Sequence, residues 1–426
     1  MKNKKENCSR YRVLPGLMAA LLLLAISSRP APAVAGRRVH FLATADTQYA
    51  DHGMCGGCPQ NCDYLLSDWF RADTTLSTMH TKRINDSTIR GLLISGDLTQ
   101  NWDVDEWIKY KNANEGGVEW LYDGLGNHDT TNPEDSSYAE SVVIRDWVRN
   151  HSRDTAVFIL PAVHNPNYSW DWEDVHFVQL NTFPADVDIS TVNPYYESLT
   201  FLMADLPPHV ATSGRPVVLI HHYGFDSFSL LQGWVTEAQL EDYWNAIKDY
   251  NVIAIFTGHN HLTAERTDSF QPFRKPAGAD SRPDGRTQIP AWISGSAMGR
   301  GGVCSFDPQE KGAFMEIDIR GQQMVLERYD QYGDVQQIES GRSSVCYTLS
   351  NDIYVLNTAN GGQFGTLFNA FTTLQQAVAA AEEFDPNCDD GDLKARDEGP
   401  VVHLEPTRFT GPISIDVPMQ LRRIIP

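Results

Sequence analysis

Positive charge is scarce in this chain of 426 residues: 34 Lys and Arg stand against 55 Asp and Glu, which gives a net charge of −21 at pH 7. Proteins that bind long nucleic acids without sequence preference neutralise backbone phosphates with Lys and Arg. The composition therefore disfavours stable nucleic-acid binding, although bound metal ions can supply positive charge locally. Small-molecule partners fit this balance of charge better.

Long apolar runs are also absent once the first 35 residues are set aside. Those residues begin with several Lys and Arg, continue with an apolar run over 14–26, and end in Ala33-Val34-Ala35. This order predicts a secretory signal peptide. The alternative, an uncleaved membrane anchor, needs roughly 20 apolar residues. We expect cleavage before Gly36, no transmembrane segment in the mature chain, and a periplasmic or extracellular location.

Cysteine is sparse as well. Six of the seven cysteines follow the expected cleavage site: Cys55, Cys58, Cys62, Cys304, Cys346 and Cys388. An even number in an exported chain predicts disulfides, whose connectivity the sequence leaves open. The three closely spaced cysteines could instead belong to a metal site, but such a site usually needs four ligands and no fourth lies nearby.

Short apolar runs alternate with amphipathic stretches between residues 39 and 261. Strands are expected over 39–45, 91–95, 119–125, 175–181, 217–221 and 252–257, and helices over 105–112, 139–150, 198–206 and 236–250. Strands that alternate with helices predict an α/β core with mainly parallel or mixed sheets. Further strands are expected over 289–294, 313–319 and 324–329, after a loop rich in Pro, Gly, Asp and Arg over 271–287.

The last part of the chain reads differently. Residues 372–383 have a helical period, 387–392 form an acidic loop, and 400–418 alternate apolar and polar residues around Gly411. Within this stretch, residues 401–412 resemble the entry turn of a right-handed parallel β-helix. One coil cannot bury its own apolar faces, because solenoids need stacked repeats. The segment is therefore β-helix-like or packs on the preceding domain. We expect three parts: a signal peptide over 1–35, a catalytic domain over 36–340, and a small β-rich C-terminal segment over 341–426.

Five short polar motifs each follow one of the apolar runs. They are Asp46-Thr47-Gln48, Gly96-Asp97, Gly126-Asn127-His128-Asp129, His221-His222 and Gly258-His259-Asn260-His261. Each motif is weak alone. If the runs are neighbouring strands, however, all five motifs meet at one edge of the sheets, where α/β folds place their ligand sites. Carboxylate, amide and imidazole groups together are ligands for divalent ions of the Mn, Fe or Zn kind.

This order of motifs resembles that of the calcineurin-like metallophosphoesterases, from residue 39 to about residue 263. The resemblance implies a four-layer α/β/β/α sandwich with two metal ions. It implies that Asp46 and His261 hold the first ion, that Asp97 bridges to the second, and that Asn127, His221 and His259 complete the second. It also implies that His128 stabilises the phosphoryl group or protonates the leaving oxygen, and that Asp129 orients the His128 ring.

Two departures from the family pattern affect these expectations. The first motif usually reads Asp-x-His, whereas here Gln48 occupies the third position and would be a weaker metal ligand. Purple acid phosphatases carry a ligating Tyr three residues after the bridging Asp, where this chain has Gln100, so a coloured iron–tyrosinate centre is not expected. His221 is favoured over His222 as the metal ligand, which leaves His222 and Tyr223 to face the substrate.

The resemblance implies hydrolysis of a phosphomonoester or phosphodiester by hydroxide that two divalent ions activate. A small ester, such as a nucleotide or a lipid headgroup, is the expected substrate. Aromatic residues that follow the motifs could line its pocket or serve in ordinary packing: Trp102, Tyr138, Tyr223, Phe225 and Trp234. The alternative from another class is an exported binding or adhesion protein with a relic metal site, which Gln48 favours and the other intact motifs oppose.

Overall fold

The computed structural model describes residues 37–50, 63–130, 138–151, 166–186 and 197–348, the last range with gaps at 212, 232, 300–309, 322 and 340, together with three short strands over 352–355, 401–404 and 420–423. The chain divides at residue 35 into two units, 1–35 and 36–426. The expected signal peptide lies outside the described residues, so its cleavage stays a prediction.

The first sheet has seven strands in the order β13-β12-β11-β1-β2-β3, with β14 also paired to β12. Its parallel half consists of β1 (Arg38–Thr44), β2 (Ile89–Ile94) and β3 (Leu121–Asp123). Its antiparallel half consists of β11 (Ala313–Arg320), β12 (Gln323–Asp330), β13 (Val335–Gln336) and β14 (Ser344–Thr348). The parallel strands all end at the same edge, so the segments that follow them lie together.

The second sheet has five strands in the order β10-β7-β6-β5-β4. They are β4 (Tyr168–Trp172), β5 (Val175–Gln179), β6 (Val217–Ile220), β7 (Val252–Thr257) and β10 (Ala291–Ile293). Only β4 runs antiparallel to its neighbour. A separate pair, β8 (Phe273–Arg274) and β9 (Gln288–Ile289), borders the expected loop over 271–287.

The two sheets pack face to face through a shared aromatic core. Phe41 of β1 meets Phe177 of β5 and Phe256 of β7 edge-on, with ring centroids 5.4 and 5.7 Å apart. Tyr122 of β3 stacks on Trp170 of β4 at 4.4 Å. Edge-to-face and offset-stacked rings add to the free energy that burial of their area supplies. This layer therefore fixes the two sheets against each other.

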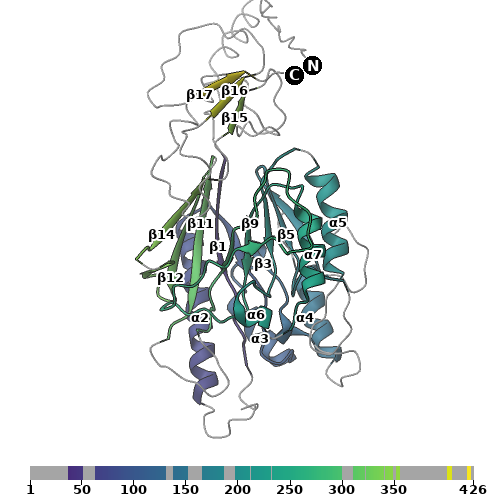
Figure 1. Cartoon of the computed structure of the whole chain (residues 1–426). Coiled ribbons are helices and arrows are strands. Elements are labelled where there is room, and N and C mark those ends of the chain that lie inside the picture. Colours follow the sequence, from purple (N-terminus) through teal and green to yellow (C-terminus); the bar gives the residue numbers. More distant parts are fainter. Residues whose placement is uncertain are drawn as a thin grey trace, which may run out of the picture. The chain divides into compact units, whose positions relative to one another are not determined.

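Helices cover the outer faces of both sheets. The first sheet is covered by α2 (Asp63–Asn85), α3 (Val104–Ala113) and α4 (Tyr138–Asn150), whose buried side chains share a core with Leu42, Leu92 and Leu121. The second is covered by α5 (Ser198–His209) and α7 (Glu237–Ile247), which lie together in Figure 1. The expected four-layer α/β/β/α sandwich is confirmed.

Three elements of the sandwich were not expected from the sequence. Helix α2 has 23 residues, but its core face is built from small or polar residues such as Ala72 and Thr75 besides Leu76 and Met79. Strand β4 pairs with β5 through a tight turn at Glu173 and Asp174. Strand β14 extends the first sheet beyond residue 340, the expected end of the catalytic domain, to Thr348.

The C-terminal strands form a small sheet of their own. Strands β15 (Asp352–Val355), β16 (Val401–Leu404) and β17 (Gln420–Arg423) pair in parallel. Parallel pairing is the geometry that a β-helix coil uses. The helix expected over 372–383 and the acidic loop over 387–392 lie outside the described residues. Of the six cysteines only Cys346 is described, so the disulfides stay a prediction.

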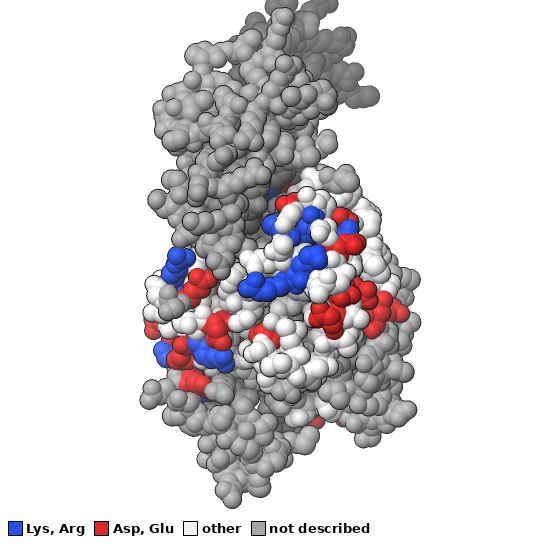
Figure 2. All heavy atoms as spheres, viewed as in Figure 1, with Lys and Arg blue, Asp and Glu red and all other residues white. Residues whose placement is uncertain are grey.

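Among the described residues, every helix is too short or too polar to cross a membrane. On the face shown in Figure 2, acidic and basic side chains lie near one another rather than in one field of a single sign.

Candidate metal centre

The five motifs meet where the parallel strands of both sheets end. Asp46, Asp97 and Asn127 follow β1, β2 and β3 of the first sheet, and His222 and the pair His259 and His261 follow β6 and β7 of the second. Because the sheets pack face to face, the two sets of side chains converge between them. The structure therefore brings together residues that are more than 200 positions apart in the chain.

Asp97 lies at the centre of this cluster. Its Oδ1 atom accepts a hydrogen bond from the backbone N–H of His128 at 2.9 Å. Its Oδ2 atom accepts one from Nε2 of Gln48 at 3.0 Å and lies 3.1 Å from Nε2 of His222. One buried carboxylate therefore contacts groups from four of the five motifs, counting its own.

Asp46 joins the two sheets on the other side of the cluster. Its Oδ1 atom accepts a hydrogen bond from the backbone N–H of His259 at 2.9 Å and lies 3.8 Å from Nε2 of His261. Asp46 and Asp97 are both fully buried. The first motif is thus held against the fifth by main chain as well as by side chain.

Two groups of possible ligand atoms share Asp97. One group is Asp97, His222 and His259, the other is Asp46, Asp97 and His261, and within each group the ligand atoms lie within 4.8 Å of one another. A shared carboxylate is what a bridging ligand between two ions requires. The arrangement is consistent with a dinuclear centre.

The donor set fits divalent metal ions. Among the described residues, five buried side-chain atoms at the cluster lack a hydrogen-bond partner: Asp46 Oδ2, Gln48 Oε1, Asn127 Oδ1, His222 Nε2 and His259 Nε2. A buried polar atom that makes no hydrogen bond costs about 1–3 kcal/mol. Oxygen and imidazole lone pairs that find no proton donor are suited to a cation of the Mn, Fe or Zn kind. These unpaired atoms are therefore candidate metal ligands.

Burial distorts the titration of the cluster when no cation is bound. Burial raises the pKa of Asp46 to about 8, against the lowering effect of His222. Burial also raises the pKa of Asp97, but His222 and His128 overcome it and hold that pKa well below its ordinary value. The pKa of His222 rises to about 9, because Asp97 and Asp46 outweigh burial. Without a cation, the raised pKa values of Asp46 and His222 favour the protonated forms of both groups at neutral pH.

The backbone at the cluster is strained. Asp46, Gln48, Asp97, His259 and His261 all have φ between +34° and +70°, a region that residues other than Gly rarely adopt. Such strain costs of order 1–3 kcal/mol at each position and gathers at functional sites. Gly126 is required by contact instead: a Cβ atom there would collide with the Asp97 carboxylate and lie 2.5 Å from its backbone nitrogen.

The expected roles of His221 and His222 are corrected. His221 was favoured as the ligand, but its ring packs against Phe183 and Tyr243 at 5.3 and 5.5 Å, on the helix side of the second sheet. Its Nδ1 atom bonds to the backbone carbonyl of Tyr223 at 2.7 Å, and burial lowers its pKa to about 3. His222 points to the opposite face and lies in the cluster with Asp97.

Both residues expected to face the substrate, His222 and Tyr223, are fully buried. His222 is fully buried among the ligand atoms, and Tyr223 is fully buried between Trp234 and His259. Tyr223 follows His222 in a turn that returns to the packed helix side, so its ring supports His259 rather than facing solvent.

His128 is positioned by a residue that sequence reasoning did not assign. Its Nδ1 atom lies 2.7 Å from the backbone carbonyl of Gln100, which can only accept, so Nδ1 carries the proton and Nε2 is left for other contacts. Gln100 is itself held by a hydrogen bond from its N–H to the Glu106 carboxylate at 3.1 Å. A backbone carbonyl leaves no signal in the sequence.

Asp129 does not orient the His128 ring as expected. Its carboxylate accepts hydrogen bonds from the backbone N–H groups of Leu98, Thr99 and Gly126 at 2.8–3.0 Å. Burial and the nearby Asp97 charge raise its pKa to about 7. Asp129 therefore ties the loop after β3 to the loop after β2, because both loops offer N–H groups that a sharp strand end leaves unpaired.

A further group of His and Asp lies away from the cluster and is already satisfied. His176 of β5 lies 2.7 Å from Asp171 and 2.6 Å from Asp205, and Nδ1 of His209 lies 3.1 Å from Asp205. Arg215 pairs with Asp171 at 2.8 Å. Each of these ligand atoms has a partner, in contrast to the unpaired atoms of the cluster, so we interpret this group as a partly buried ion-pair network.

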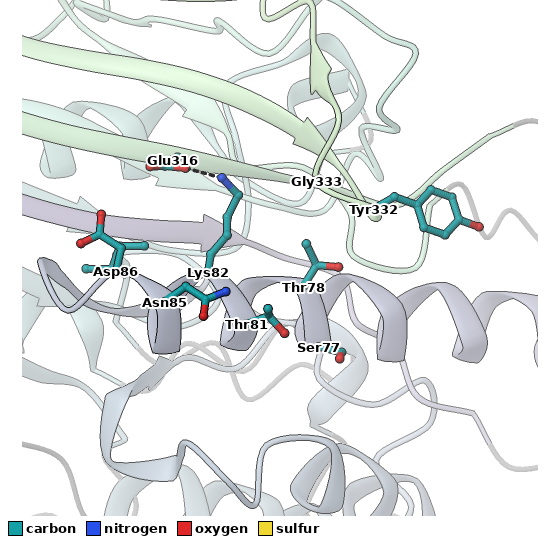
Figure 3. A pocket seen from close by; sticks show the side chains of 10 residues that line it. Ser77, Thr78, Thr81, Lys82, Asn85, Asp86, Glu316, Tyr332 and Gly333 are labelled. Atoms are coloured by element: carbon teal, nitrogen blue, oxygen red, sulfur yellow. Dashed lines mark hydrogen bonds and ion pairs between the residues drawn. The ribbon is translucent and has the colours of Figure 1, made fainter.

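A groove of about 510 Å³ lies along α2 (Figure 3). It is lined by residues of α2, by Ile89 and Glu316 of the first sheet and by the turn that follows β12, and it shares no lining residue with the metal-ligand cluster. Its Lys82 is paired with Glu316 at 2.8 Å. The groove is therefore separate from the candidate metal centre.

No protein-family model and no curated protein matches the chain. Among solved structures, a purple acid phosphatase from yellow lupin (Lupinus luteus) seeds is 15% identical with a TM-score of 0.48, covering 75% of this chain and 55% of that one. A conserved uncharacterized protein of Streptococcus pneumoniae, described as a predicted phosphoesterase, is 9% identical with a TM-score of 0.30, covering 74% and 99%. Vps29 of Chaetomium thermophilum is 13% identical with a TM-score of 0.25, covering 75% and 100%.

This chain spans little more than half the length of the lupin phosphatase. Because all three TM-scores are below 0.5, the fold is assigned from the chain itself: two facing mixed sheets, helices on both outer faces, and five motifs in the expected order at the strand ends. The chain is an α/β/β/α sandwich that resembles the calcineurin-like metallophosphoesterases, with two groups of His and Asp ligand atoms that share one carboxylate.

Proposed function

We propose that this chain is an exported hydrolase of phosphate esters that works with two divalent metal ions. The observation that carries the proposal is the pair of ligand groups that share Asp97, surrounded by buried acceptor atoms without partners in the described part of the chain. When bound, two such ions neutralise phosphoryl charge and lower the pKa of a water towards neutrality.

The residues of the chain have distinct tasks in this proposal. Asp46, Asp97, Asn127, His222, His259 and His261 would hold the ions, with Gln48 as a further candidate through its unpaired Oε1. His128 is half-buried, with Nδ1 fixed by the Gln100 carbonyl, so its Nε2 would meet the phosphoryl group or the leaving oxygen. With Nδ1–H held by the carbonyl, general acid catalysis would use the imidazolium form of His128, which carries a second proton at Nε2.

The substrate is proposed to be a small ester rather than a nucleic acid, because the net charge of −21 repels polyanions. Both phosphomonoesters and phosphodiesters fit. Activity towards para-nitrophenyl phosphate and bis-para-nitrophenyl phosphate, with added Mn or Zn, separates the two. The proposed export depends on the leader over 1–35, and N-terminal sequencing of the secreted protein tests it.

Metal analysis of the purified chain tests the proposal most directly. We expect up to two transition ions per chain, and Asp97→Asn should lose both because Asp97 belongs to both groups. A wild-type chain that takes up no metal would support the other candidate, a binding protein with a relic site, which the Gln48 substitution favours.

A further inference from the structure

We propose that the short helix α6 (Ser227–Leu231) and Trp234 form an apolar wall that binds the uncharged organic part of the phosphate ester. This inference rests on the proposed function and names a substrate class for it. We call these residues the α6 wall: Phe228, Leu230, Leu231 and Trp234.

The α6 wall is continuous with the candidate metal centre. The rings of Trp234 and Phe228 lie 4.4 and 5.3 Å from the imidazole of His259, measured between centroids. Phe228 also packs edge-on against Trp234 at 5.1 Å. An ester whose phosphoryl group sits at the metal centre would therefore place its neighbouring atoms against these rings.

The outer side of the wall is open. Leu231 is 83% exposed and Phe228 is 43% exposed, whereas His259 beneath them is 7% exposed. Isolated apolar side chains on a surface need no explanation, but an apolar patch beside a polar centre marks a ligand site more often. Here Phe228 and Trp234 contact His259, and Leu230 and Leu231 are exposed on the same short segment.

The wall is held in place by well-formed local contacts. The Asp226 carboxylate accepts hydrogen bonds from the backbone N–H groups of Phe228 and Ser229 at 2.9 and 3.1 Å, and from the Ser229 hydroxyl at 2.8 Å. A Cβ atom at Gly224 would lie 2.9 Å from Asp226 and 3.1 Å from Thr257, the last residue of β7. A side chain at residue 224 would therefore press on Asp226 and on the end of β7, the strand that leads to His259.

The charge of the segment indicates what it binds. The sequence contains no Lys or Arg from residue 216 to residue 247, so the wall offers no side chain that could hold a second phosphate or an acidic group. An apolar surface without cations favours an alkyl or aryl group. Burial of one methylene is worth about 0.8 kcal/mol, or about fourfold in an equilibrium constant.

A homologous series of substrates tests the wall. Phosphate release from n-butyl, n-hexyl and n-octyl phosphate, or from the matching methyl alkyl phosphodiesters if the chain is a diesterase, is measured with the Mn-loaded full chain. The alcohols have nearly equal acidity, so intrinsic reactivity is constant along the series. We expect kcat/KM to rise by up to about fourfold per methylene. Benzyl and cyclohexylmethyl phosphate then distinguish an aryl from an alkyl preference.

Variants assign the effect to the wall. Leu231→Gln and Phe228→Gln should flatten the rise with chain length by at least half, with metal content unchanged. Ile84→Gln is the matched control, because Ile84 is an apolar side chain on α2 that is 67% exposed. A rise that persists in both wall variants would overturn the assignment to α6.

The remaining outcomes separate this inference from the proposed function. If the wild-type chain hydrolyses no ester with either Mn or Zn, both fail. If it hydrolyses esters at rates that do not depend on chain length, only the apolar wall fails. Faster turnover of choline phosphate than of hexyl phosphate would also overturn it, because it would show a preference for a cation.

Discussion

The Oδ2 atom of Asp97 lies 3.1 Å from Nε2 of His222, and the two side chains come from different sheets. The neighbouring His221 faces the helices instead. We therefore expect His222→Ala to lose one of the two ions and His221→Phe to keep both, as measured by metal analysis after dialysis. His221→Phe should cost only about 1 kcal/mol of unfolding free energy, because one hydrogen bond is lost and the ring contacts remain. The opposite pattern would restore His221 as the ligand.

The metal-free chain should lose stability between pH 7 and pH 9. Asp46 has a pKa raised to about 8, so its folded form holds a proton that the unfolded chain has released. His222 has a pKa raised to about 9, so the stability from its protonated form is present below its ordinary pKa of 6.5 and is lost as pH rises through 9. Both effects act in the same direction. Thermal unfolding with chelator and with Mn should diverge as pH rises, and parallel curves would contradict this.

His128→Ala should keep both ions and lose turnover by about 10²–10⁴-fold, because a positioned proton donor contributes that much. Substitution of Gln100 by Ala leaves the 2.7 Å contact of its backbone carbonyl in place and removes only the 3.2 Å contact of its side chain with Nδ1, so it should cost much less turnover than His128→Ala. Full activity of His128→Ala on both nitrophenyl substrates would show that His128 has another role.

Asp129→Asn should act on the loops rather than on proton transfer. The carboxylate accepts hydrogen bonds at both oxygens, whereas an amide can accept at only one. We expect a loss of about 1–3 kcal/mol in unfolding free energy, because buried N–H groups lose their partners. The pH–rate profile of the remaining activity should be unchanged. A shifted profile would instead support the expected role beside His128.

His176→Leu tests the interpretation of the second His–Asp group. The loss should be about 1–3 kcal/mol, because the buried Asp205 carboxylate loses one partner while the exposed Asp171 keeps Arg215, and the metal content should stay at the wild-type value. Asp171 and Asp205 raise the pKa of His176 despite burial. The difference from wild type should therefore be largest below pH 6.5 and shrink above it. A third ion in the wild-type chain, absent from the variant, would show a metal site here.

The sequence predicts the sandwich well because its central strands are short, well-separated apolar runs and five of them are followed by a polar motif. It predicts α2 poorly, since residues such as Thr75 and Ala72 on its core face do not produce an apolar stripe. Local patterns also place the end of the sheet too early, because β14 joins it through pairing with β12, which only the fold reveals.

The sequence also does not show which of His221 and His222 faces the candidate metal centre. Successive residues of a strand point to opposite faces, and Val218 and Ile220 face the first sheet while Val217 and Leu219 face the helices. His222 continues the first of these two sets. Because β6 is buried on both sides, all four of its residues are apolar, and the sequence offers no sign of which face each one takes.

Each ligand group at the candidate centre draws on both sheets: Asp97 with His222 and His259, and Asp46 and Asp97 with His261. Neither half of the sandwich could hold an ion by itself. Bound ions would link the two sheets at the edge where the parallel strands end. A shift of one sheet relative to the other would therefore disrupt both ligand groups at once. Amide hydrogen exchange near the ends of β1 and β7 should therefore slow together, as one cooperative unit, when metal is added.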